Sequence, residues 1–200
     1  MSWEDAARRL EGRIVVLEPL APAHEQGLRA AAADSEVWRW MPSDASTDDG
    51  FAAWFDAALA GGRAGIEVPF AVLERKSGEP LGSTRFLTLR PKHRGLEIGH
   101  TWLASSAWGS GANVEAKLLL LGHAFERLGC IRVEFKTDAR NERSRAALEA
   151  LPARFEGVFR SHMLVRGGEL RDSAYYAVVD AEWPDVKANL LRRLRELVPK

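Results

Sequence analysis

The stretch EIGHTWLASSAWGSGANVEAKLLLLGHAFE, residues 97–126, decides the fold. It begins within a run over 95–103 whose polar and apolar residues alternate, which predicts a β-strand. It ends in a predicted amphipathic helix over about 112–128, because apolar side chains recur there at helical spacing: Val114, Leu118, Leu121, Phe125 and Leu128. Between the two lies Gly109-Ser110-Gly111. This order of strand, glycine loop and helix predicts unpaired backbone N–H groups at the helix N-terminus.

Such a helix N-terminus favours an anion, and a pyrophosphate would fit there. Taken alone, Gly-x-Gly is weak evidence, because such a pattern is more often a turn that only needs glycine torsions. A dinucleotide site of the Rossmann type would require a third glycine, an acidic residue about 20 positions further on and a largely parallel sheet. The strands before this loop predict an antiparallel meander instead. We therefore rank a Rossmann site, and with it a nicotinamide-dependent oxidoreductase, below an anion site of another kind.

Upstream of this stretch the sequence predicts two helices between strands. Residues 13–20 form a β-branched run closed by a proline, which is typical of a strand. Helices are expected over 23–33 and from Asp48 to about Gly62. Strands over 68–74 and 81–89, joined by a Ser-Gly-Glu-Pro turn, then lead into the strand over 95–103. Three consecutive strands with tight turns predict an antiparallel meander.

Downstream, residues 131–137 alternate strictly and predict a strand directly after the long helix. A strand, a helix and a second strand form a βαβ unit, which implies one parallel strand pair. A helix over 141–151 and a hairpin of strands 155–165 and 172–179 follow. A terminal helix is expected over about 184–198. The predicted fold is an α+β mixed sheet, mostly antiparallel with one parallel pair, flanked by helices, in a single domain over 1–200 with a core of about 13–180.

The composition limits the classes of partner. The chain has 200 residues, of which 46% are hydrophobic, enough for one full core. Its 28 basic and 28 acidic residues balance, so overall charge gives no reason to expect nucleic acid or an anionic membrane as partner. Cys130 is the single cysteine, and no paired Cys/His spacing indicates a metal site. With no signal-peptide pattern at the start and no long apolar run, we expect a cytoplasmic protein.

A resemblance to a known family rests on the run Glu97-Ile98-Gly99-His100, on 108–116 and 123–126, and on Arg132-Val133-Glu134-Phe135-Lys136-Thr137-Asp138 with Asn141-Glu142-Arg143-Ser144. In order and spacing, these segments resemble the GNAT N-acetyltransferases of the RimJ/RimL type. The resemblance covers nearly all of residues 13–180. It implies the GNAT fold, acetyl-CoA as co-substrate without a metal, and transfer of the acetyl group to a primary amine in a ternary complex.

The resemblance also implies which residues bind CoA. The family pattern at the glycine loop is Gln/Arg-x-x-Gly-x-Gly/Ala, and this chain departs from it with a tryptophan first and an asparagine last. Backbone N–H groups do most of the binding there, so such departures should be tolerated. The residues expected to bind the co-substrate are Trp102, Leu103, Trp108, Gly109, Ser110, Gly111, Ala112, Asn113, Val114, Asn141 and Arg143.

Two residues are the catalytic candidates. Acyl transfer to an amine requires removal of a proton from the ammonium and a proton source for the leaving thiolate. Glu97 is where the resemblance places the base, although it is equally compatible with a solvent-facing strand position. The resemblance also implies the acid, because in RimJ/RimL-like relatives a serine can replace the tyrosine that other GNAT enzymes use. The only tyrosines here, Tyr175 and Tyr176, lie on the last strand, so Ser144 is the candidate acid. Asn141, at a helix start, is in any case a good N-cap.

The acceptor side is predicted less directly. Trp38 and Trp40 are candidates to line it, but large apolar side chains in a loop are also commonly core plugs. His100 and His162 are further candidates for acceptor binding, and His123 is most simply a packed histidine. Arginines cluster near the expected phosphates, where they could bind CoA or form a solvated helix face: Arg140, Arg143 and Arg145.

Several alternatives stay open at this point. The acceptor could be a protein N-terminus, a lysine or a small amine. A GNAT fold without turnover, acting as an acyl-CoA-binding sensor or scaffold, would share most of these features. An exposed meander edge and the terminal helix lead us to expect a homodimer.

Overall fold

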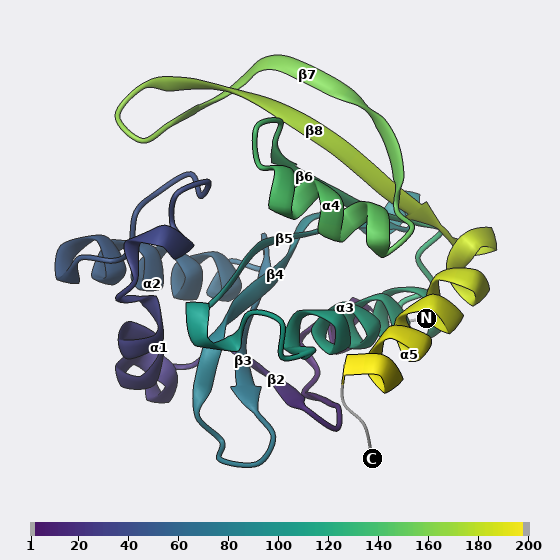
Figure 1. Ribbon diagram of the computed structural model, residues 1–200, viewed down its shortest axis with the longest axis horizontal. Helices are drawn as coiled ribbons and strands as arrows, with labels where there is room; N and C mark the ends of the chain where they lie inside the picture. The colour runs from purple at the N-terminus through teal and green to yellow at the C-terminus, as the bar shows by residue number, and fades with distance from the viewer. Residues whose placement is uncertain (1–2, 198–200) are drawn as a thin grey trace.

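The computed structural model describes residues 3–197, and within them one mixed sheet of eight strands runs through the molecule (Figure 1). The strand order is β1-β2-β3-β4-β5-β6-β8-β7. The strands are β1 (Leu10–Glu11), β2 (Val15–Pro19), β3 (Val68–Glu74), β4 (Pro80–Arg90), β5 (Gly95–Leu103), β6 (Arg132–Asp138), β7 (Arg154–Val165) and β8 (Glu169–Val179). Adjacent strands pair antiparallel except β5 and β6, which are parallel. The predicted mixed sheet with one parallel pair is confirmed.

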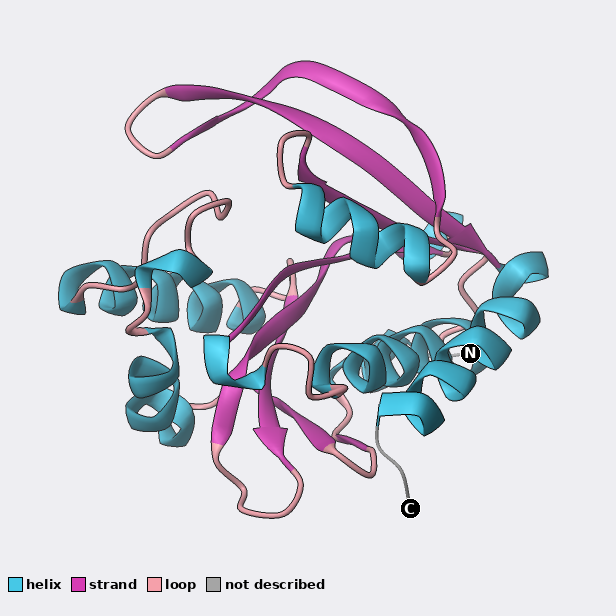
Figure 2. Ribbon diagram, viewed as in Figure 1, coloured by secondary structure: helices cyan, strands magenta, loops and turns pink. Residues whose placement is uncertain are grey.

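Helices cover both faces of this sheet (Figure 2). They are α1 (Glu25–Ala32), α2 (Asp48–Arg63), α3 (Ala112–Gly122), α4 (Glu142–Ala150) and α5 (Trp183–Leu197). Alternating side chains of β2 and β3 separate into two cores. Val15, Leu17 and Phe70 pack with α3, α4 and α5, whereas Val16 and Ala71 pack with α1 and α2. The predicted elements therefore form, within a few residues of their expected bounds. Residue 198, the expected end of the terminal helix, lies outside the described residues.

The long helix ends differently from the prediction. Regular α-helix stops at Gly122, and a turn of π-helix follows over His123–Arg127. His123 is buried there, stacks on Phe86, and its Nε2 lies 2.9 Å from the Asp5 carbonyl oxygen. The predicted packed histidine is confirmed. The wider π-turn accommodates the His123 side chain between the helix and the sheet, and the apolar residues that follow it, Phe125 and Leu128, remain in the core.

The meander has no exposed edge. β3 is covered by β2, and β5 by β6, so the outermost strands are β1 and β7. The expectation of an exposed meander edge was wrong, because the N-terminal strands β1 and β2 extend the sheet beyond it. The homodimer stays a prediction, without that edge as its basis. Among residues 3–197, every helix is too short or too polar to cross a bilayer.

Candidate functional site

The parallel strands β5 and β6 separate soon after they meet. They pair only from Gly95 with Arg132 to Glu97 with Glu134. A cavity of ≈ 480 Å³ lies where they diverge, between α3 and α4 on one side and the β7–β8 hairpin on the other. Most of the predicted site residues line it: Glu97, His100, Trp102, Leu103, Trp108, Gly109, Gly111, Asn113, Val114, Asn141, Arg143, Ser144 and, from the loop before α2, Trp40.

The N-terminus of α3 opens into this cavity. Gly109 and Gly111 have φ of +77° and +87°, torsions that favour glycine. The Glu115 N–H donates to the Gly111 carbonyl at 2.9 Å, the first bond of the helix. The N–H groups of Asn113 and Val114 precede this bond and have no acceptor in the helix. The loop therefore presents free N–H groups and the positive end of the helix dipole to the cavity.

Ser110 and Ala112 shape the loop without lining the cavity. The Ser110 hydroxyl donates to the Ala107 carbonyl at 2.7 Å and accepts from the Ala112 N–H at 3.3 Å. Ala112 is fully buried in the core. Ser110 and Ala112 therefore stabilise the conformation of the loop, and the residues beside them line the cavity.

Trp108 and Arg143 join the glycine loop to α4. The Arg143 guanidinium lies 3.7 Å from the centre of the Trp108 ring. The Trp108 indole N–H donates to the Leu103 carbonyl at 3.0 Å, which fixes the ring. Asn141 caps α4 as predicted, because its side chain accepts from the Ser144 N–H at 3.0 Å. Trp108, whose departure from the family pattern put a side-chain contribution in doubt, thus holds a cation beside the anion site of α3.

The other two arginines of the predicted cluster pair elsewhere. Arg140 donates to both carboxylate oxygens of Asp138 and pairs with Glu169. Arg145 donates to the Tyr176 hydroxyl at 3.1 Å. Both therefore hold α4 and its N-terminal loop against the sheet, leaving Arg143 as the arginine beside the anion site.

Glu97 lies in the cavity wall and is 4% exposed. Its carboxylate accepts from the Lys136 ammonium at 3.2 Å and from the Thr88 hydroxyl at 3.3 Å. Its neighbours Leu96 and Ile98 point into the opposite core, as the alternation predicted. The alternative of a solvent-facing strand residue is wrong for Glu97, because its side chain is buried and its carboxylate contacts Lys136 and Thr88.

A bulge interrupts β5 beside Glu97. Ser83 pairs with Trp102 but Arg85 pairs with Gly99, which leaves one extra residue on β5, and His100 has φ +47°. Burial, together with the charges of Arg85, Lys136 and Arg171, lowers the pKa of His100 to about 4. The imidazole is therefore neutral near pH 7. Its buried Nδ1 has no hydrogen-bond partner within the described residues.

Two buried cations of the cavity wall were missed by the sequence analysis. Lys117 of α3 is 8% exposed, and its ammonium donates to the Thr101 hydroxyl at 2.8 Å. Burial lowers the pKa of Lys117 to about 7. Arg171 of β8 is 5% exposed. Lys117 could have been found, since it lies three residues after Val114 and four before Leu121 on the apolar face; the inward orientation of Arg171 has no such signal.

Two predicted acceptor residues lie outside the cavity lining. Trp38 is 1% exposed, donates to the Ala32 carbonyl at 2.8 Å and packs against Trp102 with ring centres 5.0 Å apart. It is a core plug, the alternative that the sequence left open. His162 is held within the hairpin by the Ser173 hydroxyl at 3.1 Å and the Tyr175 hydroxyl at 3.3 Å. Of the two tryptophans, Trp40 lines the cavity.

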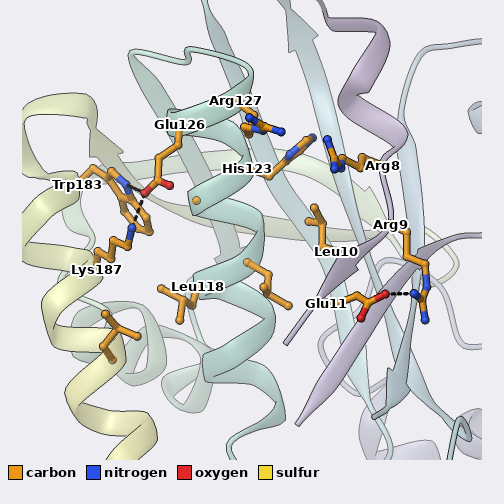
Figure 3. Close-up of a pocket in the computed structure, with 13 residues that line it drawn as sticks. Arg8, Arg9, Leu10, Glu11, Leu118, His123, Glu126, Arg127, Trp183 and Lys187 are labelled. Atoms are coloured by element: carbon orange, nitrogen blue, oxygen red, sulfur yellow. Dashed lines mark hydrogen bonds and ion pairs between the residues drawn. The ribbon is translucent and has the colours of Figure 1, made fainter. Parts of the chain in front are cut away.

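A second, shallower depression lies between β1, α3 and α5 (Figure 3). Several of its charged groups pair with one another. Glu126 accepts from the Trp183 indole and from Lys187, both at 2.8 Å, and Arg9 pairs with Glu11. His123 at its floor is already bonded to the Asp5 carbonyl. Paired charges of this kind stabilise the surface, whereas the cavity beside β5 carries buried polar atoms without partners among the described residues.

Comparisons with known proteins agree with this geometry. The sequence profile of the acetyltransferase (GNAT) domain matches residues 15–154. YdaF of Bacillus subtilis (strain 168), provisionally named a ribosomal N-acetyltransferase, is 33% identical over 110 residues. That match spans 55% of this chain and 59% of YdaF.

Solved structures extend the likeness over the whole fold. A protein from T. thermophilus, provisionally described as an acetyltransferase, is 44% identical with a TM-score of 0.81, over 93% of this chain and 96% of that one. Mycobacterium smegmatis RimJ in complex with CoA-disulfide, 24% identical, shares the fold with a TM-score of 0.75 over 90% and 88% of the two chains. Sequence, fold and site together show that the chain belongs to the GNAT acetyltransferase family.

Proposed function

We propose that this protein transfers an acetyl group from acetyl-CoA to a primary amine by direct attack in a ternary complex. The observation that carries this proposal is the N-terminus of α3, whose free N–H groups open into the cavity where β5 and β6 separate. Such an arrangement suits a diphosphate with a long substituent that reaches between two strands. Membership of the GNAT family supports the same donor.

The residues present fit acetyl-CoA. Within residues 109–114, the N–H groups of the residues that line the cavity, together with the Arg143 guanidinium, would meet the pyrophosphate. Asn113 Oδ1 is buried without a partner among the described residues, so it can accept a hydrogen bond from an amide N–H of the pantetheine. The acceptor would enter from the hairpin side, past Trp40.

Glu97 is the proposed base. Its carboxylate lies in the cavity wall, where it can take a proton from the arriving ammonium directly or through water. β5 has a bulge at His100, and residues 97–103 of this strand line the cavity, where a backbone N–H group can stabilise the negative charge that develops on the thioester oxygen. Lys136 holds Glu97 in place through their ion pair.

Ser144 is the proposed acid for the departing thiolate. It lines the cavity at the start of α4, and Asn141 binds its N–H, which leaves its hydroxyl free to act as donor. Cys130 supports direct transfer. It is buried outside the cavity lining, and burial raises the pKa of its thiol to about 11, so it is a poor nucleophile for an acetyl-enzyme.

The acceptor is proposed at the level of a primary amine. The name of YdaF points to ribosomal-protein amino groups as one class to test. The experiment measures free thiol released from acetyl-CoA with peptide N-termini, lysine peptides and small amines, with an amine-free reaction as control. Amine-dependent thiol release is expected. Tight CoA binding without release for any amine would instead support an acyl-CoA-binding sensor or scaffold.

A further inference from the structure

Arg171 is a buried cation without a partner among the described residues. It comes from β8, lines the cavity and is 5% exposed. Within residues 3–197 its side chain makes no ion pair, and its Nε is buried without a hydrogen-bond acceptor. A buried guanidinium carries five N–H donors, and leaving them unsatisfied costs free energy. Such a group is normally stabilised by an anion.

The carboxylates around Arg171 already have partners. Asp138 accepts from Arg140 at 3.0 and 2.9 Å, and Glu97 accepts from Lys136 at 3.2 Å. By contrast Arg85, buried to the same extent on β4, pairs with Glu67 at 2.8 Å. Of these two buried arginines, Arg85 therefore has a carboxylate partner, whereas Arg171, which lines the cavity, has none among the described residues.

Arg171 reaches the cavity from the β7–β8 hairpin, whereas the elements that would hold CoA are α3 and α4. Arg171 pairs in register with Met163 across the hairpin, and both line the cavity. The loop before α2 contacts this hairpin, since the Arg166 N–H donates to the Pro42 carbonyl at 3.2 Å. The proposed base lines the same cavity. Burial lowers the pKa of Arg171, and the nearby charges of Asp138 and Glu97 act in the opposite direction. An acceptor amine at Glu97 would therefore bring its other substituents to Arg171.

We propose that the acceptor carries a carboxylate beside its amine, and that Arg171 binds this carboxylate with two N–H donors. The proposal rests on the acetyl transfer proposed above. Two sources fit the chemistry: a free amino acid, and a peptide whose acidic group lies close to its N-terminal amine. Glu97 and Lys136 pair with each other, whereas the Arg171 guanidinium has no ion pair within residues 3–197 and can bind the carboxylate. The neutral His100, with an unpaired buried Nδ1, adds a polar contact in the same cavity.

The test compares matched acceptors. Wild-type protein should show a kcat/KM about 10-fold or more higher for an α-amino acid than for its amide, or for a peptide with an N-terminal Asp than for one with Asn. The two pairs tell a free amino acid from an acidic peptide. Equal values within both pairs would overturn the proposal.

Variants connect the preference to Arg171. Arg171→Met should lower kcat/KM about 10–100-fold more for carboxylate acceptors than for their amides, and Arg171→Lys should restore part of the preference. Arg160→Met, at an exposed arginine of the same hairpin, is the control and should keep the wild-type preference. A preference that survives in a folded Arg171→Met protein, as judged by circular dichroism, would overturn the assignment.

A failure of the proposed function is distinguishable from a failure at Arg171. If no amine is acetylated, the Arg171 site can still be tested by calorimetry, which measures the binding of aspartate and of asparagine amide to the CoA-loaded protein. Binding of the carboxylate that is lost in Arg171→Met supports the site even without turnover. Equal binding of both ligands, or equal binding by wild type and variant, contradicts it.

Discussion

Glu97 and Lys136 come from neighbouring strands and meet where those strands begin to separate. Their ion pair is accessible from the cavity, and Glu97 is the buried carboxylate best placed to accept a proton from a bound amine. Glu115 is buried to the same extent, but it accepts from the N–H groups of Arg13, Ile14 and Val15. The two glutamates therefore differ in surroundings: Glu97 lines the cavity, and Glu115 holds β2 to α3.

Replacing Glu97 by Gln should lower the acetylation rate by about 10²–10⁴-fold. The loss should be largest at low pH and partly recovered as pH approaches the pKa of the acceptor, because more of the amine then arrives without its proton. Ser144→Ala should cost less and show no recovery with pH, since water can partly replace the acid.

Steady-state rates across about pH 6 to 9 test this difference. Glu115→Gln is the matched control. It should lower the thermal unfolding temperature, because it weakens buried backbone contacts, while the shape of the pH profile stays that of wild type. A wild-type rate for Glu97→Gln at the acid end would mean that the base lies elsewhere.

Lys117 gives the protein a pH-dependent stability of its own. Burial lowers its pKa from 10.5 to about 7 in the folded state. Below about pH 7 both folded and unfolded states are protonated and the burial cost is fully present. Between pH 7 and 10.5 the unfolded state binds more protons, so this cost falls as pH rises.

The free energy of unfolding of wild type minus that of Lys117→Met should therefore increase with pH over that window, by up to about 1.4 kcal/mol per pH unit. Urea unfolding at several values from about pH 6 to 9.5 measures it, with the exposed Lys92→Met as control for the loss of a lysine. Parallel curves for wild type and Lys117→Met would show that the ammonium keeps its charge throughout.

At the scale of elements, we expect α3 and the loop before it to bind CoA. Gly111→Val should raise the CoA dissociation constant about 10-fold or more, because a β-branched residue is strained at φ +87° and would crowd the approach of a phosphate. Gly78→Val is the matched control. Gly78 has φ +77° in the turn between β3 and β4, with no atom within 4 Å of an added Cβ. It should lose stability to a similar degree yet bind CoA normally.

Isothermal titration with CoA compares the two glycine variants. Normal binding by a folded Gly111→Val would place the CoA site away from this loop. Weaker binding by both variants alike would show that loss of stability, and not the loop, is responsible.

Element order and type were predictable because each long element has a clear period. Helix α3 shows its apolar stripe, and β6 alternates strictly, so even the parallel pair followed from the sequence. The bulge at His100 and the π-turn at His123 were not predictable, since both depend on which neighbour an element packs against. The sheet edge was missed for the same reason: the pairing of β1 and β2 with the meander is a contact between distant segments.

Site residues that lie close together in the sequence, such as Gly109 and Gly111, could be predicted. Site residues that reach the cavity only through the pairing of distant segments could not. Arg171 is 60 residues from Gly111 in the chain, and only the β7–β8 hairpin brings it to the same cavity. Trp38 is an opposite case, a predicted site residue that lies in the core. The sequence alone does not distinguish a loop tryptophan that lines a cleft from one that fills a core.

At the scale of the whole molecule, the sheet is packed on both faces and open at one place. Core side chains fill the space between β2, β3 and the helices on either side. Beyond Glu97, β5 and β6 separate, and the resulting cavity reaches from the glycine loop of α3 to the β7–β8 hairpin. Both proposed substrates would thus enter one cavity from opposite ends and meet near Glu97.

A crystal structure of the protein with CoA is the most direct test of the proposed site. We expect the pyrophosphate to accept hydrogen bonds from N–H groups of residues 109–114, and the thiol to lie between β5 and β6 near Glu97. CoA bound in the depression between β1, α3 and α5, or a pyrophosphate away from the glycine loop, would contradict it.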